Sequence, residues 1–394
     1  MLGALLAWEH GSGRGHVVPL RTVAEAVSDR FTFDAALCKL DFKDELAGLC
    51  NAVQGPWLPF SDEYRKAHGN PASSTWGELL GDSGFRRPEI LCESIGWWQG
   101  VMRECDISLV IADNAPCALL AARGLGIPSI AIGAGYWVPP PNMPSFPVLL
   151  PQHSIRIYDE AEIVETINSV VPQFGVPTLE RLPEVYASSD QLAFTLEMLD
   201  PYTEWRSRPL LPPIIGGTVE PSSDGDEIFI YFSTTEKSDP GLMQAVGDLG
   251  VPVRAFIPGI ESAAADDLTR RGVIVERSPV PVDLVAKRSR LLVNAAQHGT
   301  LCMGLAAGLP QVSVPQQREQ QHNAKAAERH GVLVCVDKAD RDAERFRSIV
   351  LDAYRDTAMA RRARDLAQSL RPQFQANQRK MIRRRIAAVM DYRV

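Results

Sequence analysis

Short apolar runs alternate with segments of helical spacing along most of the chain. The runs suited to buried strands are Ala4–Trp8, Phe31–Leu37, Ile107–Ala112, Ser129–Ile132, Ile228–Ser233, Val253–Ile257, Val273–Glu276, Leu291–Asn294, Gln311–Val314 and Val332–Val336. Helical spacing appears over Val18–Val27 and Asn114–Arg123, and in a long stretch from about Arg341. Because strands that alternate with helices usually pair in parallel, the pattern predicts an α/β fold with two Rossmann-like series.

Three segments interrupt this alternation. Cys50–Glu104 is irregular with little periodicity, and Tyr136–Gln152 is so rich in proline that it predicts a loop. Asp200–Asp226 combines prolines, Gly-Gly and a Ser-Ser-Asp-Gly-Asp cluster, which is typical of a domain boundary. The predicted divisions are an N-terminal domain over 1–215, a C-terminal domain over 216–372 and a C-terminal helix over 373–394.

Composition narrows the class of protein. The 394 residues are enough for two domains, and the net charge of −7 argues against a nucleic-acid binder, which needs a basic face. Seven scattered cysteines without a CxxC pair indicate reduced thiols, as in a cytoplasm. The first eight residues lack a positively charged start and are interpreted as a strand rather than a signal peptide. No apolar run approaches the roughly 18 residues needed to span a bilayer.

The run Ser289–Ala324 has the order strand, glycine turn, helix, strand and acidic-amide loop. Gly299 and Thr300 open the helix, where free N–H groups, the helix dipole and a hydroxyl can bind an anion. Glu319 and Gln320 follow the second strand, and their carboxylate and amide can hydrogen-bond sugar hydroxyls. The run therefore predicts adjacent sites for a diphosphate and a sugar, although an ordinary βαβ unit is the alternative.

This run resembles the donor-binding signature of GT-B glycosyltransferases of the macrolide and UDP-glycosyltransferase type (glycosyltransferase family 1). The positions that fit are Gly299, Thr300, Ala307, Gly308, Pro310, Pro315, Glu319, Gln320, Asn323 and Ala324. The family's His-Gly-Gly falls instead on Ala295, Ala296 and Gln297, and the nearby imidazole is His298. Two interpretations stay open: His298 contacts the diphosphate from a shifted position, or backbone amides and Thr300 bind it alone.

The N-terminal segment Gly15–Leu20, GHVVPL, resembles a second element of the same family. The resemblance implies that His16 is the general base that deprotonates the acceptor hydroxyl, and an imidazole of ordinary pKa near 6.5 suits that task. It also implies that Asp113, after the strand Ile107–Ala112, orients His16. The alternatives are a solvated histidine and an aspartate that caps the following helix.

The resemblance implies further contacts. Ser233 and Thr234 would touch the diphosphate, and Ser278 and Val280 lie in the loop that holds the nucleotide base, without the tryptophan common there. The proposed acceptor residues are Gly13, Trp97, Tyr136 and Trp137. Gly13 belongs to a glycine-rich turn that could equally cradle a phosphate.

The expected protein is a cytoplasmic GT-B enzyme with two Rossmann-like domains facing a central cleft. The resemblance implies an inverting, metal-independent hexosyltransferase of the Leloir type, in bacterial natural product or glycolipid biosynthesis. It would move a sugar from a UDP or dTDP sugar, with no other cofactor, to a small apolar or lipid-like acceptor, as a monomer or homodimer. The alternatives are a sugar-nucleotide epimerase of the same fold and a catalytically silent binding protein.

The predicted last helix, Pro372–Tyr392, carries five basic residues: Arg379, Lys380, Arg383, Arg384 and Arg385. Such a helix can rest on an anionic membrane. A solvated face with Ile382, Ile386 and Val389 packed on the protein body is the favoured interpretation.

Overall fold

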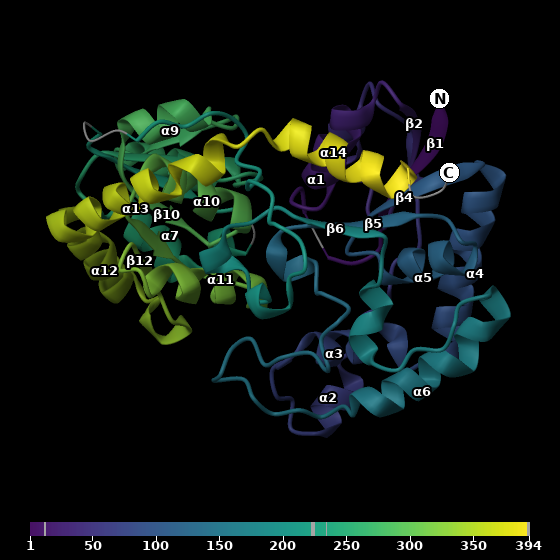
Figure 1. Ribbon diagram of the computed structural model, residues 1–394. Helices are drawn as coiled ribbons and strands as arrows, with labels where there is room; N and C mark the ends of the chain where they lie inside the picture. The colour runs from purple at the N-terminus through teal and green to yellow at the C-terminus, as the bar shows by residue number, and fades with distance from the viewer. Residues whose placement is uncertain (12, 222–224, 234, 392–394) are drawn as a thin grey trace. The chain divides into compact units, whose positions relative to one another are not determined.

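The computed structural model describes residues 1–11, 13–221, 225–233 and 235–391. The chain forms two compact units, Met1–Leu211 with Asn377–Val394, and Pro212–Ala376 (Figure 1). The change of unit at Leu211 lies four residues before the boundary expected at 215. No helix of the described residues is long and apolar enough to cross a membrane.

The first unit is built on a six-stranded parallel sheet in the order β3-β2-β1-β4-β5-β6. Its strands are β1 (Leu2–Trp8), β2 (Phe31–Leu37), β3 (Ala52–Gln54), β4 (Ile107–Asp113), β5 (Ser129–Gly133) and β6 (Asp190–Ala193). Its α-helices are α1 (Val17–Val27), α2 (Glu63–Ala67), α3 (Trp76–Leu80), α4 (Pro88–Glu104), α5 (Pro116–Gly124), α6 (Glu160–Val170) and α14 (Gln378–Asp391). The central strands form because their apolar runs are buried on both faces of the sheet.

The second unit repeats this topology in the order β12-β11-β10-β7-β8-β9. Its strands are β7 (Glu227–Tyr231), β8 (Val253–Phe256), β9 (Ile274–Glu276), β10 (Ser289–Asn294), β11 (Gln311–Ser313) and β12 (Leu333–Cys335). Its α-helices are α7 (Pro240–Gly247), α8 (Ser262–Arg270), α9 (Val282–Arg288), α10 (His298–Ala307), α11 (Arg318–Glu328), α12 (Ala343–Arg355) and α13 (Thr357–Gln375). Both sheets thus have the Rossmann order, with a topological switch point beside β1 in one and β7 in the other.

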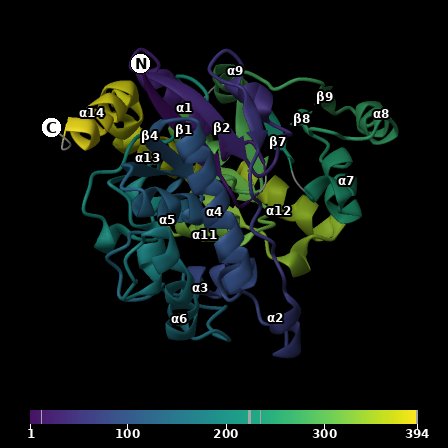
Figure 2. The ribbon, with the colours of Figure 1, turned by 90° about the vertical axis from the view of Figure 1, so that its right-hand side faces the viewer.

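The expectation that residues 50–104 are irregular was wrong. Helix α4 covers the last 17 of them, and Figure 2 shows it lying across the first sheet next to α5. Leu91, Ile95, Trp98 and Met102 are buried at spacings of four, three and four residues, which is the helical period. Gly96 and Gly100 between them obscure this pattern in the sequence.

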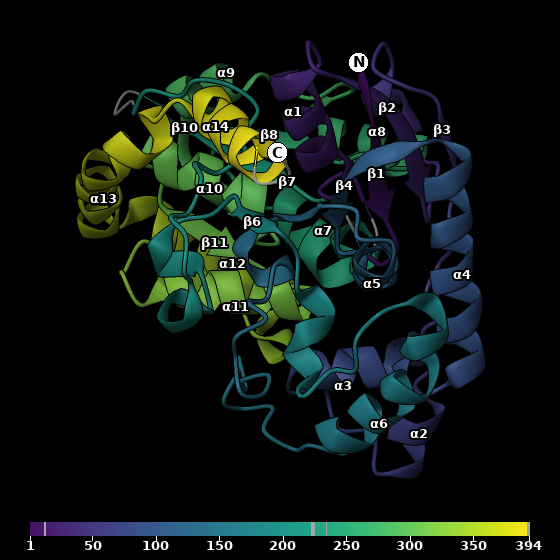
Figure 3. The ribbon, with the colours of Figure 1, turned by 45° about the vertical axis from the view of Figure 1, so that its right-hand side comes forward.

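The C-terminal helix also differs from the expectation. Pro372 lies inside α13, and the last helix, α14, begins only at Gln378. Helix α14 packs beside α1 of the first unit (Figure 3). Ile382 and Ile386 are its buried residues, as expected, while Val389 is only half-buried.

Candidate active site

His16 and Asp113 meet at the switch point of the first sheet. Strands β1 and β4 are neighbours, with Trp8 opposite Asp113 in the parallel register. The turn after β1 brings His16 back just before α1, where its Nδ1 lies 2.6 Å from Oδ1 of Asp113. The two residues are 6% and 1% exposed, so the pair is buried rather than solvated. Ligands of Rossmann-like sheets bind beyond the carboxyl ends of the strands at this point.

The pairing defines what His16 can do chemically. A carboxylate that accepts the Nδ1–H bond leaves Nε2 with a free lone pair, which can accept a proton. Burial raises the pKa of the Asp113 carboxyl, and the neighbouring His16 opposes that rise. Asp113 does not cap the next helix, because the N-cap residue of α5 is Ala115. The geometry therefore matches a base with an orienting acid.

Aromatic rings surround His16. Trp8 stacks on the imidazole at 5.2 Å between ring centroids, and Trp137 meets it edge-on at 5.1 Å. Trp76 contacts both Trp137 and Tyr136, which extends the aromatic wall. The predicted acceptor residues Tyr136 and Trp137 thus belong to the surroundings of the base.

Trp97 is different from Tyr136 and Trp137. It lies on α4 and contacts Trp98 edge-on at 5.1 Å, partly buried against the core of the first unit. Within the described residues no ring contact joins Trp97 to His16. Trp8 does contact His16, and Trp76 contacts it only indirectly, through Trp137. Nothing in the sequence distinguishes these two from the other tryptophans.

The glycines of the turn have distinct roles. Gly11 has φ +109°, and a Cβ there would collide with Nε2 of His16. Gly13 also has a positive φ, +103°, but nothing lies within 4 Å of the place of its Cβ. Gly11 therefore gives the imidazole its space, and Gly13 stays a predicted acceptor contact.

Glu9 is a buried residue that sequence reasoning missed. Its carboxyl oxygens accept hydrogen bonds from the backbone N–H groups of Cys117 and Ala118, at 2.9 and 2.8 Å. These groups are in the first turn of α5, so Glu9 takes the capping role that Asp113 could have had. The side chain is fully buried, and this burial raises its pKa to about 8. Glu9 therefore fixes α5 directly behind Asp113.

Glu9→Gln should destabilise the first unit most at low pH. Because the pKa is raised, the folded chain keeps a proton on Glu9 that the unfolded chain releases. The contribution of this proton to the free energy of unfolding is complete below about pH 4.5 and is lost as the pH rises towards 8. Because glutamine does not titrate, the deficit of the variant should shrink by roughly 2–4 kcal/mol between pH 5 and 8.

Urea unfolding followed by tryptophan fluorescence measures this effect, because all seven tryptophans lie in the first unit. Glu89→Gln, in the exposed first turn of α4, is the matched control for removing an acid from a helix start. A deficit that grows with pH would contradict the assignment.

The second candidate site lies at the switch point of the second sheet. Helix α10 begins at His298, and its N-cap residue Gln297 makes no side-chain cap hydrogen bond. Gln297 instead donates from Nε2 to Oγ of Ser233, at 2.9 Å, which brings the end of β7 to the start of α10. Thr300 lies in the same first turn, whose N–H groups are suited to an anion. Thr234 lies outside the described residues.

The loop before α10 keeps a glycine-like shape without glycine. Ala296 has φ +60° and occupies a position where the resembling family has glycine. Asn294 accepts a 2.6 Å hydrogen bond from the Ala296 amide and is itself bonded to Gln311 and Ser313, at 2.9 Å each. This buried polar network holds the loop in that shape, and its signal in the sequence is an asparagine at the end of a buried strand.

Glu319 and Gln320 lie in the first turn of α11, not in a loop as expected. Asn323 donates to the Ala296 carbonyl and to the Glu319 carboxylate, at 3.3 Å each, so Glu319 is held beside the start of α10. Gln320 is buried, and its Oε1 accepts from the amides of Gln316 and Gln317. The Gln320 oxygen therefore caps its own helix, and only its NH₂ group is left for a ligand.

His298 lies close to this cluster. Its Nε2 is 3.7 Å from the Cys302 sulfur. Burial, and secondarily the charge of Glu319, raise the pKa of the Cys302 thiol. His298 and Glu319, the predicted diphosphate and sugar contacts, are thus both neighbours of Cys302.

The predicted base-binding residues are placed differently. Ser278 is exposed in the loop after β9, while Val280 is half-buried against the apolar core under α9 and α10. In the described part of the chain no hydrogen bond ties Ser278 to the start of α10. These two positions remain predictions from the resemblance.

Comparison with known proteins places this geometry in context. No protein-family model matches the chain. A PGL/p-HBAD biosynthesis glycosyltransferase of Mycobacterium tuberculosis is 23% identical over 369 residues, covering 82% of this chain and 80% of the relative.

Solved structures are similar over nearly the whole length. The calicheamicin glycosyltransferase CalG4 gives a TM-score of 0.69 at 15% identity, with 99% of this chain and 98% of that chain covered. Glycosyltransferase VinC, in complex with dTDP, gives 0.66 at 15% identity and full coverage of both chains. The spinosyn rhamnosyltransferase SpnG, complexed with spinosyn aglycone, gives 0.67 at 16% identity, covering 97% and 99%. The chain therefore has the GT-B fold of the macrolide and UDP-type glycosyltransferases.

Proposed function

We propose that this chain is an inverting glycosyltransferase that moves a sugar from a nucleoside-diphosphate sugar to a hydroxyl of a small apolar or lipid-like acceptor. The observation that carries the proposal is the 2.6 Å contact between Nδ1 of His16 and Oδ1 of Asp113, buried at the switch point of the first sheet.

The acceptor reacts at the first unit. Its hydroxyl gives a proton to Nε2 of His16 while its oxygen attacks the anomeric carbon of the donor sugar. The carboxylate of Asp113 keeps the required tautomer and stabilises the imidazolium that forms. Because the new C–O bond forms opposite the bond to the diphosphate, which breaks with its electron pair, the anomeric configuration inverts.

The donor binds to the second unit. The N–H groups of the first turn of α10, the Thr300 hydroxyl, Ser233 and His298 would stabilise charge on the leaving diphosphate, so the reaction needs no metal ion. Glu319, held by Asn323, would accept hydrogen bonds from the sugar hydroxyls.

The similar proteins support the substrate classes. VinC was solved with dTDP and SpnG with spinosyn aglycone, and the mycobacterial relative is named for PGL/p-HBAD biosynthesis. Trp137 and Tyr136, which pack on the buried Trp76, would offer an apolar acceptor the flat surface that aromatic rings prefer. We propose a UDP or dTDP sugar as donor.

Incubation with a panel of UDP and dTDP sugars and phenolic or macrolide acceptors tests the proposal. The expected result is an acceptor glycoside of inverted configuration by NMR, formed equally in the presence of EDTA, with release of nucleoside diphosphate. A donor sugar isomerised without any acceptor would indicate an epimerase instead. Donor binding seen as a thermal shift, without turnover of any pair, would indicate a silent binding protein.

A further inference from the structure

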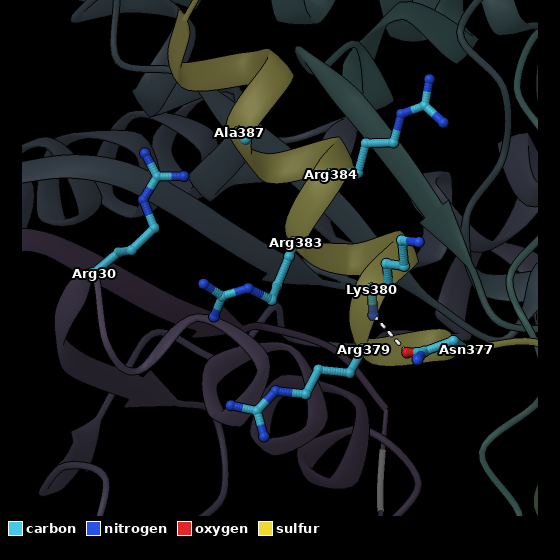
Figure 4. Close-up of a pocket in the computed structure, with 7 residues that line it drawn as sticks. All are labelled: Arg30, Asn377, Arg379, Lys380, Arg383, Arg384 and Ala387. Atoms are coloured by element: carbon cyan, nitrogen blue, oxygen red, sulfur yellow. Dashed lines mark hydrogen bonds between the residues drawn. The ribbon is translucent and has the colours of Figure 1, made fainter.

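A basic surface on the first unit has no role in the proposed transfer. An open pocket of about 470 Å³ beside α14 is lined by five cationic residues, Arg30, Arg379, Lys380, Arg383 and Arg384, and otherwise by uncharged residues (Figure 4). Arg30 comes shortly after α1, so the fold places a cation from a distant part of the chain beside those of α14. This set of five is called the basic pocket below.

Two arginines fasten α14 to the unit. Arg383 donates to the Asp29 carboxylate, at 2.8 Å from Nη2, and to the Ala26 carbonyl, at 2.9 Å. Arg385, outside the pocket, forms an ion pair with Asp190. With Ile382 and Ile386 buried beneath, these contacts hold the helix against the unit.

The other cations of the basic pocket have no such task. The described residues place no carboxylate within 4.0 Å of Arg30, Arg379, Lys380 or Arg384, and all four side chains are exposed. Like charges gathered this closely repel one another, while the chain as a whole carries a net charge of −7. An anionic partner would relieve that repulsion.

Apolar groups adjoin the charges. A second open pocket, of about 1020 Å³, shares Arg384 with the first and has Ile127, Pro128, Met381 and Val389 in its lining. Figure 4 shows the side chain of Arg384 on the opposite side of α14 from those of Arg379 and Arg383. Cationic and apolar groups therefore lie side by side across the helix.

We propose that α14 and Arg30 dock this unit on an anionic lipid bilayer. Lipid phosphates would bind the basic pocket, while the apolar lining of the second pocket would contact the acyl boundary, as in helices that lie in the membrane interface. A nucleic acid would use the cations but not the apolar groups beside them. The docking goes beyond the proposed transfer and does not depend on it.

Co-sedimentation of the full chain with vesicles tests the docking. The chain should bind vesicles of phosphatidylcholine mixed with phosphatidylglycerol, and not phosphatidylcholine alone, and added salt should weaken the binding. Each cation near an anionic surface changes the partition by about fivefold, so Arg379→Gln, Lys380→Gln and Arg384→Gln together should lower it by about 100-fold. If the triple variant shows a lowered Tm, the single variant Arg384→Gln should still lower the partition onto vesicles by about fivefold.

The matched control removes the same charge from the second unit. Arg329, Lys338 and Arg355 are exposed cations there, and replacing all three with glutamine should leave vesicle binding within about twofold of the wild type. Equal loss in the two triple variants would overturn the proposal, as would equal binding to both vesicle types or to neither. Displacement from anionic vesicles by single-stranded RNA, with tight RNA binding through the same residues, would assign the surface to nucleic acid and also overturn it.

Discussion

His16→Ala should lower kcat by about 10²–10⁴-fold and leave the Kd of the nucleoside diphosphate unchanged. In the proposed reaction the lost group is the proton acceptor, which lies on the first unit, whereas the proposed donor residues lie on the second. Product formation under saturating donor and acceptor gives kcat, and isothermal titration gives the Kd. His68→Ala, which removes an exposed imidazole of the same unit, is the matched control and should keep full activity.

Asp113→Asn separates the orienting role from a structural one. The NH₂ group of an asparagine can donate to Nδ1, which stabilises the tautomer with its proton on Nε2, so kcat should fall by up to about 10⁴-fold. Because Glu9 rather than Asp113 caps α5, the Tm should change little. A variant with normal kcat and a lowered Tm would contradict the assignment and favour a capping role after all.

Much of the fold could be predicted because buried parallel strands leave a strong signal. Strand β2 was predicted to the residue over Phe31–Leu37, and β10 within two residues. Strand β10 is nearly all buried, while in β2 the exposed Thr32 and Asp34 alternate with buried apolar residues, and both patterns are typical of strands. Strand β6 and helix α4 gave no comparable signal. Strand β6 is only four residues long. In α4, glycines and polar residues stand between the apolar residues of the buried face, so the helical period is hard to see in the sequence.

The candidate site was predictable only where a motif fixes local geometry. His16, Asp113 and Glu319 stand in recognisable elements. His16 and Asp113 lie at the switch point of the first sheet, and Glu319 is held through Asn323 beside the loop that follows β10. Glu9 and Asn294 act through contacts with residues that are 108 and 19 positions away in sequence. From the sequence, a glutamate after a strand is expected to be a solvated loop residue. Only the fold shows that the start of α5 lies beside Glu9. Spacing along the chain carries no information about such contacts.

The donor residues should divide into those that bind diphosphate and one that binds sugar. Glu319→Ala should lower kcat/KM for the nucleotide sugar by about 10–100-fold, because a charge-assisted hydrogen bond to a hydroxyl is lost, and should leave nucleoside-diphosphate affinity unchanged. Thr300→Val should weaken the binding of nucleoside diphosphate and nucleotide sugar alike, by about tenfold, because Thr300 lies in the first turn of α10, where we propose that the diphosphate binds.

Paired isothermal titrations of nucleoside diphosphate and intact nucleotide sugar measure this division. Glu344→Ala is the matched control, because Glu344 stands exposed in the first turn of α12 as Glu319 stands in the first turn of α11. Asn323→Ala should reproduce part of the Glu319→Ala effect, since Asn323 holds that carboxylate beside the loop of Ala296. If Glu319→Ala weakens nucleoside diphosphate as much as nucleotide sugar, Glu319 shapes the start of α10 rather than contacting the sugar, and the proposed sugar site is wrong.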